Sequence, residues 1–145
     1  MKLFLDSANV QDILDRYSSG LIAGITTNPT LIKKNGEMPY LVYRKLAEAG
    51  IKDISMEVVG DDEATLYSNA VGHVKEWDDI ATIKLPCSMD GIRVCKRLRD
   101  ISVRTNVTLV FSPSQAILAA LAGATYVSPF IGRMDDNSFD GLHLI

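Results

Sequence analysis

A lysine near the end of an apolar segment has the clearest potential for covalent chemistry in this sequence. Lys84 lies within Ile80–Pro86, whose β-branched composition predicts a strand buried on both faces. A buried ammonium is unfavourable unless it is paired or loses its proton. A neutral amine in a shielded site can attack a carbonyl carbon and form a Schiff base. The simpler alternative is that Lys84 extends its ammonium group to water at the strand end.

Further side chains with chemical potential fall near the ends of other predicted strands. Residues two apart in a strand share one face, and the carboxyl ends of the strands of a parallel barrel meet at one mouth. Such a mouth is where polar groups can converge on a ligand. The residues are Asp6, Thr26, Asn28, Glu57, Asn106, Thr108, Ser128 and Phe130, with Arg133 in the segment that follows.

Each of these residues also has a simpler explanation. Asp6 can cap a helix, Asn28 can belong to an ordinary turn, and threonine, as at Thr108, is common in strands. Arg133 in a loop can be solvated. Glu57 is harder to explain, because an unpaired carboxylate in an apolar strand is unfavourable. Their joint placement, rather than any single residue, indicates a site.

The elements that position these residues alternate regularly between strands and helices. Each predicted strand is followed by a helix or by the start of one, which predicts a parallel sheet with right-handed crossovers. The predicted strands are Lys2–Asp6, Leu21–Thr26, Asp53–Val59, Ile80–Leu85, Val103–Phe111 and Thr125–Phe130. Residues 132–141 are predicted as loop, and a helix is predicted to begin at His143.

Two architectures fit this alternation, a doubly wound open sheet and a closed (β/α)8 TIM barrel. The first βα turn, residues 6–9, contains no glycine, so the dinucleotide-binding fingerprint is absent. The polar strand ends favour the barrel, and residues 1–145 are predicted to form one domain holding its first six β-α units. Such barrels usually need about 200 residues or more, so a truncated barrel is expected, with completion by a second chain as the alternative.

Composition narrows the class of protein. The formal net charge of −3 is spread over mixed charges, which argues against nucleic acid or an anionic membrane as the main partner. No apolar run approaches the roughly 20 residues of a membrane span, and the N-terminus lacks a signal-peptide core. Cys87 and Cys95 lack metal or redox spacing, and His73 and His143 show no ligand pattern. We therefore predict a cytoplasmic protein without metal or cofactor.

Five stretches resemble the transaldolase family, in the short-chain subfamily that also includes fructose-6-phosphate aldolases. They occur in the family's order and with similar spacing between residue 3 and about residue 136. The stretches are Phe4–Asp6, Gly24–Thr30, Ile83–Pro86, Asn106–Ser112 and Ser128–Arg133. The resemblance implies the barrel fold, sugar-phosphate substrates, no cofactor and, for a full-length chain, a homo-oligomer.

The resemblance also implies catalytic roles for four residues. Lys84 is similar to the Schiff-base lysine that attacks the ketose carbonyl. Asp6 is similar to the acid/base that takes the hydroxyl proton as the carbon–carbon bond breaks. Glu57 and Thr108 resemble the pair that holds a water for proton transfer during imine formation.

Six further residues resemble the family's substrate-binding groups. Asn28, Asn106 and Ser128 are similar to the residues that hydrogen-bond the dihydroxyacetone hydroxyls, and Thr26 belongs to the same motif as Asn28. Phe130 resembles the aromatic wall beside the lysine, and Arg133 resembles part of the phosphate site. A guanidinium group suits a phosphate because its fork of donors can bind two oxygens together.

The implied reaction moves a dihydroxyacetone unit from sedoheptulose 7-phosphate to glyceraldehyde 3-phosphate. The products are erythrose 4-phosphate and fructose 6-phosphate. In the aldolase branch of the family, glutamine stands in place of Glu57 and tyrosine in place of Phe130, so both positions are of the transaldolase type. The alternatives are a fructose-6-phosphate aldolase-like enzyme and a non-catalytic barrel that binds sugar phosphates.

Overall fold

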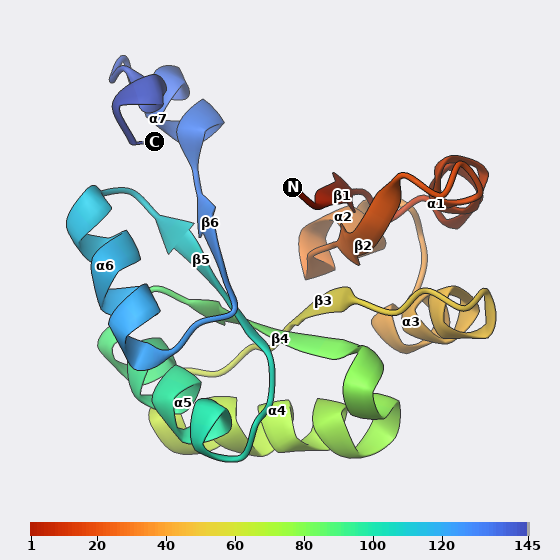
Figure 1. Ribbon diagram of the computed structural model, residues 1–145, viewed down its shortest axis with the longest axis horizontal. Coiled ribbons are helices and arrows are strands. Elements are labelled where there is room, and N and C mark those ends of the chain that lie inside the picture. Colours follow the sequence, from red (N-terminus) through yellow and green to blue (C-terminus); the bar gives the residue numbers. More distant parts are fainter. Residues whose placement is uncertain (145) are drawn as a thin grey trace. The chain divides into compact units, whose positions relative to one another are not determined.

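The computed structural model describes residues 1–144, which divide into two compact units (Figure 1). Unit 1 comprises Met1–Glu57 and Gly72–Thr82, and unit 2 comprises Val58–Val71 and the chain from Ile83 onward. The division falls inside helix α4 (Glu63–Trp77) and strand β4 (Ala81–Pro86). A single domain over residues 1–145 stays a prediction.

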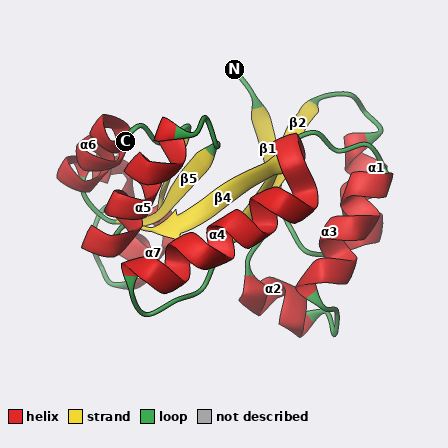
Figure 2. Cartoon of the chain, turned by 90° about the horizontal axis from the view of Figure 1, so that it is seen from below, coloured by secondary structure: helices red, strands yellow, loops and turns green. Residues whose placement is uncertain are grey.

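Unit 1 contains three parallel strands that pair in chain order. Its elements are β1 (Leu3–Asp6), α1 (Val10–Tyr17), β2 (Ile22–Thr26), α2 (Pro29–Lys34), α3 (Pro39–Glu48) and β3 (Ile54–Glu57), with the 3-10 helix η1 (Asp78–Ile80). β1 pairs with β2 and β2 with β3, so that Asp6 lies opposite Thr26 and Thr26 lies opposite Ser55. Helices α1 and α3 contact each other on one side of β1 and β2 (Figure 2).

A buried carboxylate joins two segments of unit 1. Asp53 is 5% exposed and accepts a hydrogen bond from the Thr82 hydroxyl at 2.6 Å. Its backbone carbonyl accepts the N–H of Ile25 at 2.8 Å. A Cβ atom on Gly24 would lie 2.7 Å from that same carbonyl oxygen, so only glycine allows this close approach of β2. These contacts fix the position of β3, whose last residue is Glu57.

Unit 2 continues the alternation of strands and helices. It contains most of β4, then α5 (Met89–Asp100), β5 (Thr105–Val110), α6 (Pro113–Ala122), β6 (Tyr126–Pro129), α7 (Ile131–Asp136) and the 3-10 helix η2 (Gly141–Leu144). β5 pairs in parallel with β4 and with β6. Helices α5 and α6 contact each other and β5, and both lie on the same side of these strands in Figure 1.

Hydrogen-bonding caps make the helices begin soon after the strands end. The Ser88 hydroxyl accepts the N–H of Gly91 at 3.1 Å at the start of α5. The Ser112 hydroxyl accepts the N–H of Gln115 at 3.2 Å, and the Gln115 side chain accepts the N–H of Phe111 at 2.7 Å. These bonds satisfy N–H groups that a helix start leaves without partners. The strand ends are therefore held by short, well-defined connections.

The structure confirms the predicted fold class. Six strands, each followed by helix, form part of a (β/α)8 barrel, and strand order follows chain order within each unit. A doubly wound sheet instead reverses its strand order at a switch point.

One predicted segment is wrong. Residues 132–141 are not all loop, because α7 spans Ile131–Asp136. Gly132 suggested a break, but it lies in the first turn of α7, where the space for a Cβ is open toward the rest of the described residues. The predicted helix start at His143 corresponds to η2, which ends at Leu144, and Ile145 lies outside the described residues.

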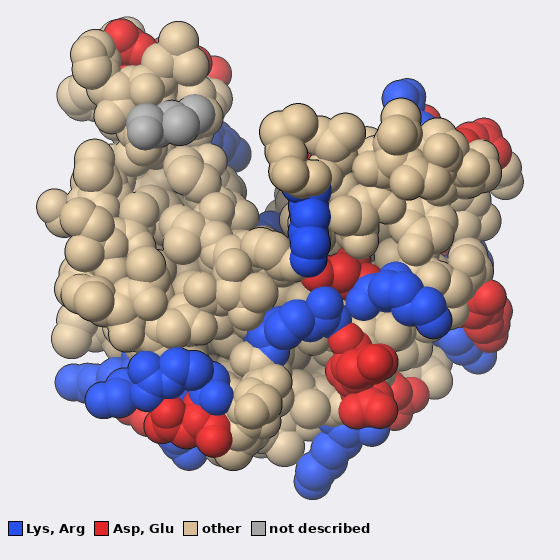
Figure 3. Space-filling model, viewed as in Figure 1, with Lys and Arg blue, Asp and Glu red and all other residues tan. Residues whose placement is uncertain are grey.

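Helix α6 has an unusually apolar outer surface. Its sequence contains no charged residue, and Ile117, Leu118 and Leu121 are all more than half exposed. Figure 3 shows the corresponding surface as an area without charged side chains. Clustered apolar side chains of this kind are typical of an interaction surface. Within residues 1–144, no helix has the length and apolar character needed to cross a membrane.

Candidate active site

An amine, an amide and a hydroxyl come together at three strands of unit 2. Lys84 on β4 is opposite Asn106 on β5, and the two residues are 6% and 2% exposed. The Ser128 hydroxyl on β6 donates to the Asn106 side-chain oxygen at 2.8 Å. The Lys84 amine therefore lies on a buried strand, beside an amide that is itself held by a hydroxyl group.

The hydroxyl of Thr108 lies two residues further along β5. Thr108 is 3% exposed and stands opposite Pro86 of β4. Among the residues that the structure describes, no group forms a hydrogen bond with its side-chain oxygen. A buried polar group without a partner costs about 1–3 kcal/mol. A bound water or ligand oxygen would remove that cost, so Thr108 marks a position suited to a polar ligand.

The segment that follows β6 carries the aromatic ring of Phe130 and the guanidinium group of Arg133. The backbone N–H of Phe130 donates to the carbonyl of Val110 at 2.9 Å. Its half-buried ring packs edge-on against Phe111, with 5.7 Å between ring centroids. Arg133 lies on α7 with its side chain exposed. The ring is therefore fixed to the end of β5, whereas the guanidinium group can reach into solvent.

Unit 1 carries the predicted acid/base at the end of β1. The Thr26 hydroxyl donates to the Asp6 carboxylate at 2.8 Å, and the two residues are direct neighbours in the β1–β2 register. Asp6 is exposed and Thr26 is half-buried. The hydrogen bond orients the carboxylate, while its exposure leaves it accessible to a ligand. Asp6 does not cap α1, because Asn9 does so by accepting the N–H of Asp12 at 3.1 Å.

Asn28 lies between the end of β2 and the start of α2, and its side chain caps that helix. Its side-chain oxygen accepts the N–H of Leu31 at 2.9 Å and caps α2. The simpler explanation offered by the sequence was an ordinary turn, and the structure shows a helix cap instead. The side-chain nitrogen of Asn28 takes no part in that bond, so the cap holds the amide in one orientation. A role in ligand binding stays a prediction.

Glu57 is the half-buried last residue of β3, and it lies beside Tyr43. The sequence analysis did not single out Tyr43. Tyr43 on α3 is 1% exposed, and its ring packs edge-on against His73 and Trp77. Burial raises the pKa of Tyr43 to about 12; the negative charge of Glu57 adds to this shift and a backbone hydrogen bond with Glu57 opposes it. Tyr43 therefore keeps its proton at neutral pH. The sequence gave no sign of this contact, because Tyr43 and Glu57 are brought together only by the packing of α3 against β3.

The predicted site residues thus form two described sets. Unit 1 brings together Asp6 and Thr26 and holds Asn28 and Glu57 at the ends of neighbouring strands. Unit 2 brings together Lys84, Asn106 and Ser128 and places Thr108 and Phe130 at the end of the same sheet, with Arg133 following in α7.

The two cysteines are thiols with reduced reactivity. Burial raises the pKa of the Cys87 thiol. Burial also raises the pKa of Cys95, and this effect outweighs the hydrogen bond with Thr105 and the positive charge of Arg99, which both lower it. A raised pKa lowers the fraction of reactive thiolate. Within residues 1–144, no three His, Cys, Asp or Glu side chains lie close enough together to hold a metal ion.

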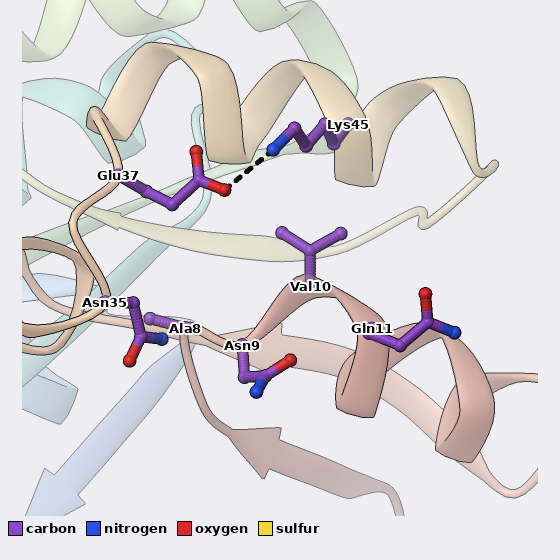
Figure 4. Close-up of a pocket in the computed structure, with 7 residues that line it drawn as sticks. All are labelled: Ala8, Asn9, Val10, Gln11, Asn35, Glu37 and Lys45. Atoms are coloured by element: carbon purple, nitrogen blue, oxygen red, sulfur yellow. Dashed lines mark hydrogen bonds and ion pairs between the residues drawn. The ribbon is translucent and has the colours of Figure 1, made fainter.

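A separate groove of about 460 Å³ lies at the start of α1 in unit 1 (Figure 4). Lys45 and Glu37 form an ion pair of 2.7 Å across it, so the ammonium of this lysine is already neutralised by a carboxylate. None of the predicted site residues lines the groove, and we assign it no ligand. Its lining is Ala8, Asn9, Val10, Gln11, Asn35, Glu37 and Lys45.

Comparison with known proteins identifies the family. The model of the transaldolase/fructose-6-phosphate aldolase family matches residues 3–143. Curated relatives named probable transaldolase include those of Carboxydothermus hydrogenoformans, 45% identical over 148 aligned residues, and Erythrobacter litoralis, 46% identical over 147. Each alignment covers all of this chain, and 67% and 66% of the two relatives. The chain therefore spans about two thirds of the length of these relatives, and it belongs to the transaldolase/fructose-6-phosphate aldolase family.

Proposed function

We propose that this chain carries the nucleophile and the acid/base of a transaldolase that transfers a dihydroxyacetone unit between sugar phosphates. The observation that carries the proposal is the buried Lys84 beside Asn106 at the end of the unit 2 strands. The probable transaldolases that match the whole chain support the same reaction class. Because the chain spans about two thirds of those relatives, its activity and substrates are proposals.

The first step forms an imine. The neutral amine of Lys84 adds to the C2 carbonyl of the ketose phosphate to give a carbinolamine. Loss of its hydroxyl group as water then leaves a protonated imine. This loss requires proton transfer to the departing oxygen, and a water held by Glu57 and Thr108 would carry that proton. The unsatisfied Thr108 hydroxyl supports such a water position.

The second step breaks the carbon–carbon bond. Asp6 takes the proton from the C4 hydroxyl, the C3–C4 electron pair moves into the imine, and an aldose phosphate leaves. The imine becomes an enamine on Lys84 and avoids a free carbanion, because the protonated nitrogen accepts the electron pair. The enamine then attacks an acceptor aldehyde, and Asp6 returns the proton to the new hydroxyl group.

The remaining residues hold the bound fragment. Asn28, Asn106 and Ser128 would hydrogen-bond the dihydroxyacetone hydroxyls, which keeps the enamine in position until the acceptor arrives. Thr26 orients Asp6 through its 2.8 Å hydrogen bond. Phe130 forms an apolar wall, and Arg133 would bind the phosphate through its fork of donors.

The test is reductive trapping with fructose 6-phosphate and borohydride. The wild-type chain should gain a stable mass on Lys84, which peptide mass spectrometry locates. Lys84→Arg should give no adduct, because a guanidinium group stays protonated and cannot attack. Lys96→Arg, at an exposed position on α5, is the control and should trap like wild type. An adduct at wild-type yield in Lys84→Arg would disprove the mechanism.

A fructose-6-phosphate aldolase is the second candidate, because the matching family includes both activities. The two differ in whether dihydroxyacetone is released without an acceptor. Phe130 has no hydroxyl that could protonate the enamine, which favours transfer over release. Free dihydroxyacetone formed from fructose 6-phosphate alone would favour the aldolase. Absence of any Lys84 adduct at saturating sugar phosphate would favour a non-catalytic binding protein.

A homo-oligomer and a cytoplasmic location also stay predictions. The apolar outer surface of α6, with Ile117, Leu118 and Leu121, is a reasonable place for subunit contact. Sedimentation velocity would give the mass in solution.

A further inference from the structure

Strand β5 contains an extra residue near the site, and this irregularity sits beside Thr108. Val107 pairs with Val127 of β6, but the next pair is Val110 with Pro129. Between these pairs β5 therefore advances one residue more than β6, which defines a β-bulge. Bulges redirect side chains and often lie next to active sites.

The backbone of Leu109 accounts for the bulge. Its φ angle is 59°, in the left-handed region that a non-glycine residue rarely adopts. Leu109 is 42% exposed, so tight packing in the core does not compensate for this conformation. Strain of this kind persists only where the surrounding structure fixes it, and it concentrates at functional sites.

Hydrogen bonds on both sides of Leu109 hold the strained residue in place. The Thr108 carbonyl accepts the N–H of Cys87, just after β4, at 2.8 Å. The Val110 carbonyl accepts the N–H of Phe130, just after β6, at 2.9 Å. The bulge therefore lies between two fixed points, and it connects the orientation of Thr108 with the position of Phe130.

We propose that Leu109 is a positioning residue whose left-handed backbone sets the direction of the Thr108 hydroxyl and the placement of the Phe130 ring. This inference rests on the proposed function, because it assigns a purpose to residues of that site. Leu109 itself touches no reacting atom in the proposal. Its side chain can be replaced, provided that the new residue accepts a positive φ.

Two substitutions at residue 109 separate backbone conformation from side-chain chemistry. Leu109→Gly removes the side chain but readily adopts a positive φ. Leu109→Val introduces a β-branched residue that disfavours it. We expect Leu109→Val to slow trapping of fructose 6-phosphate on Lys84 by about tenfold or more, with the half-saturating sugar concentration unchanged within about threefold. Leu109→Gly should trap at nearly the wild-type rate.

Ser102 supplies a matched control. It is an exposed non-glycine residue of unit 2 with a φ of 61°, and it follows α5 instead of the site. Ser102→Val and Ser102→Gly should change stability as the Leu109 variants do, but leave the trapping rate unchanged. Equal slowing in Leu109→Val and Ser102→Val would show a general loss of stability and overturn the proposal.

A double-mutant comparison tests whether Leu109 affects trapping by positioning the Thr108 hydroxyl. Thr108→Val alone should slow trapping, and adding Leu109→Val should slow it by less than about twofold further, because the hydroxyl to be positioned is gone. Fully additive effects would mean that Leu109 acts independently of Thr108, against the proposal.

An NMR measurement tests the proposed role of Leu109 without relying on adduct formation. Nuclear Overhauser contacts between the Phe111 and Phe130 rings, whose centroids lie 5.7 Å apart, should persist in Leu109→Gly and be lost in Leu109→Val. If these contacts persist in Leu109→Val, residue 109 does not determine the bulge and the inference is wrong. Failure of the wild-type chain to form an adduct would instead contradict the proposed function, and the ring contacts would still give their own answer.

Discussion

Two threonine hydroxyls, Thr26 in unit 1 and Thr108 in unit 2, differ in their hydrogen bonding. In unit 1, Thr26 donates to the exposed Asp6 carboxylate, so both polar groups have a partner. In unit 2, the Thr108 hydroxyl is buried and has no hydrogen-bond partner among residues 1–144. The residue after it adopts a left-handed backbone.

The two units therefore contribute different kinds of polar group. The strand end of unit 1 presents a carboxylate that is oriented in advance and open to solvent. The strand ends of unit 2 hold a buried amine, that of Lys84, and the buried hydroxyl of Thr108. A ligand oxygen that bonded to the Thr108 hydroxyl would stabilise the folded state, because it would satisfy a buried polar group.

The largest expected effect comes from Asp6→Asn, which separates cleavage from imine formation. An amide cannot take the hydroxyl proton, so carbon–carbon cleavage should fall about 10²- to 10⁴-fold while the imine still forms. Mass spectrometry after borohydride should then show a six-carbon sugar phosphate adduct on Lys84 in place of a three-carbon one. Asp15→Asn, at an exposed position on α1, is the control. A three-carbon adduct formed at the wild-type rate would show that Asp6 is not the acid/base of carbon–carbon cleavage.

The next effect concerns alkaline stability and belongs to unit 1. The pKa of Tyr43 rises from its ordinary value of 10.0 to about 12 on folding. Below pH 10 both states keep the proton. Between pH 10 and 12 the unfolded state loses it first, so the free energy of unfolding should fall with rising pH, by up to about 3 kcal/mol at 1.36 kcal/mol per pKa unit.

Urea unfolding between pH 8 and 12 measures this slope. Tyr43→Phe should remove it, because phenylalanine has no proton to lose. Tyr40→Phe, on the same helix but half exposed, should keep the slope. The prediction is wrong if Tyr43→Phe loses stability above pH 10 as steeply as wild type.

The smallest effect compares the two threonines directly. Thr108→Val should raise the free energy of unfolding by about 1 kcal/mol, because it removes a buried hydroxyl without a partner. Thr26→Val should lower it by about 0.5–1 kcal/mol, because Asp6 loses a hydrogen bond near solvent. Urea unfolding near pH 7 measures both values. Changes of the same sign in the two variants would contradict the contrast between the strand ends.

Much of the architecture could be predicted because its causes are local. Ser88 and Ser112 cap their helices through bonds to N–H groups only three residues further along, and Gly123, with a φ of 93°, ends α6. The β-branched segment around Lys84 forms a buried strand, as its composition predicted. The prediction failed at α7, since a glycine in an exposed first turn does not prevent a helix.

The sequence by itself determined the order of the six β-α units, the capped helix starts and the residue types at the strand ends. The tertiary structure alone decided the left-handed backbone of Leu109 and the contact between Tyr43 and Glu57. The physical reason is the range of the interactions. Helix caps and apolar periodicity act over a few residues, whereas the bulge depends on hydrogen bonds from Cys87 and Phe130, which reach β5 from two other parts of the chain.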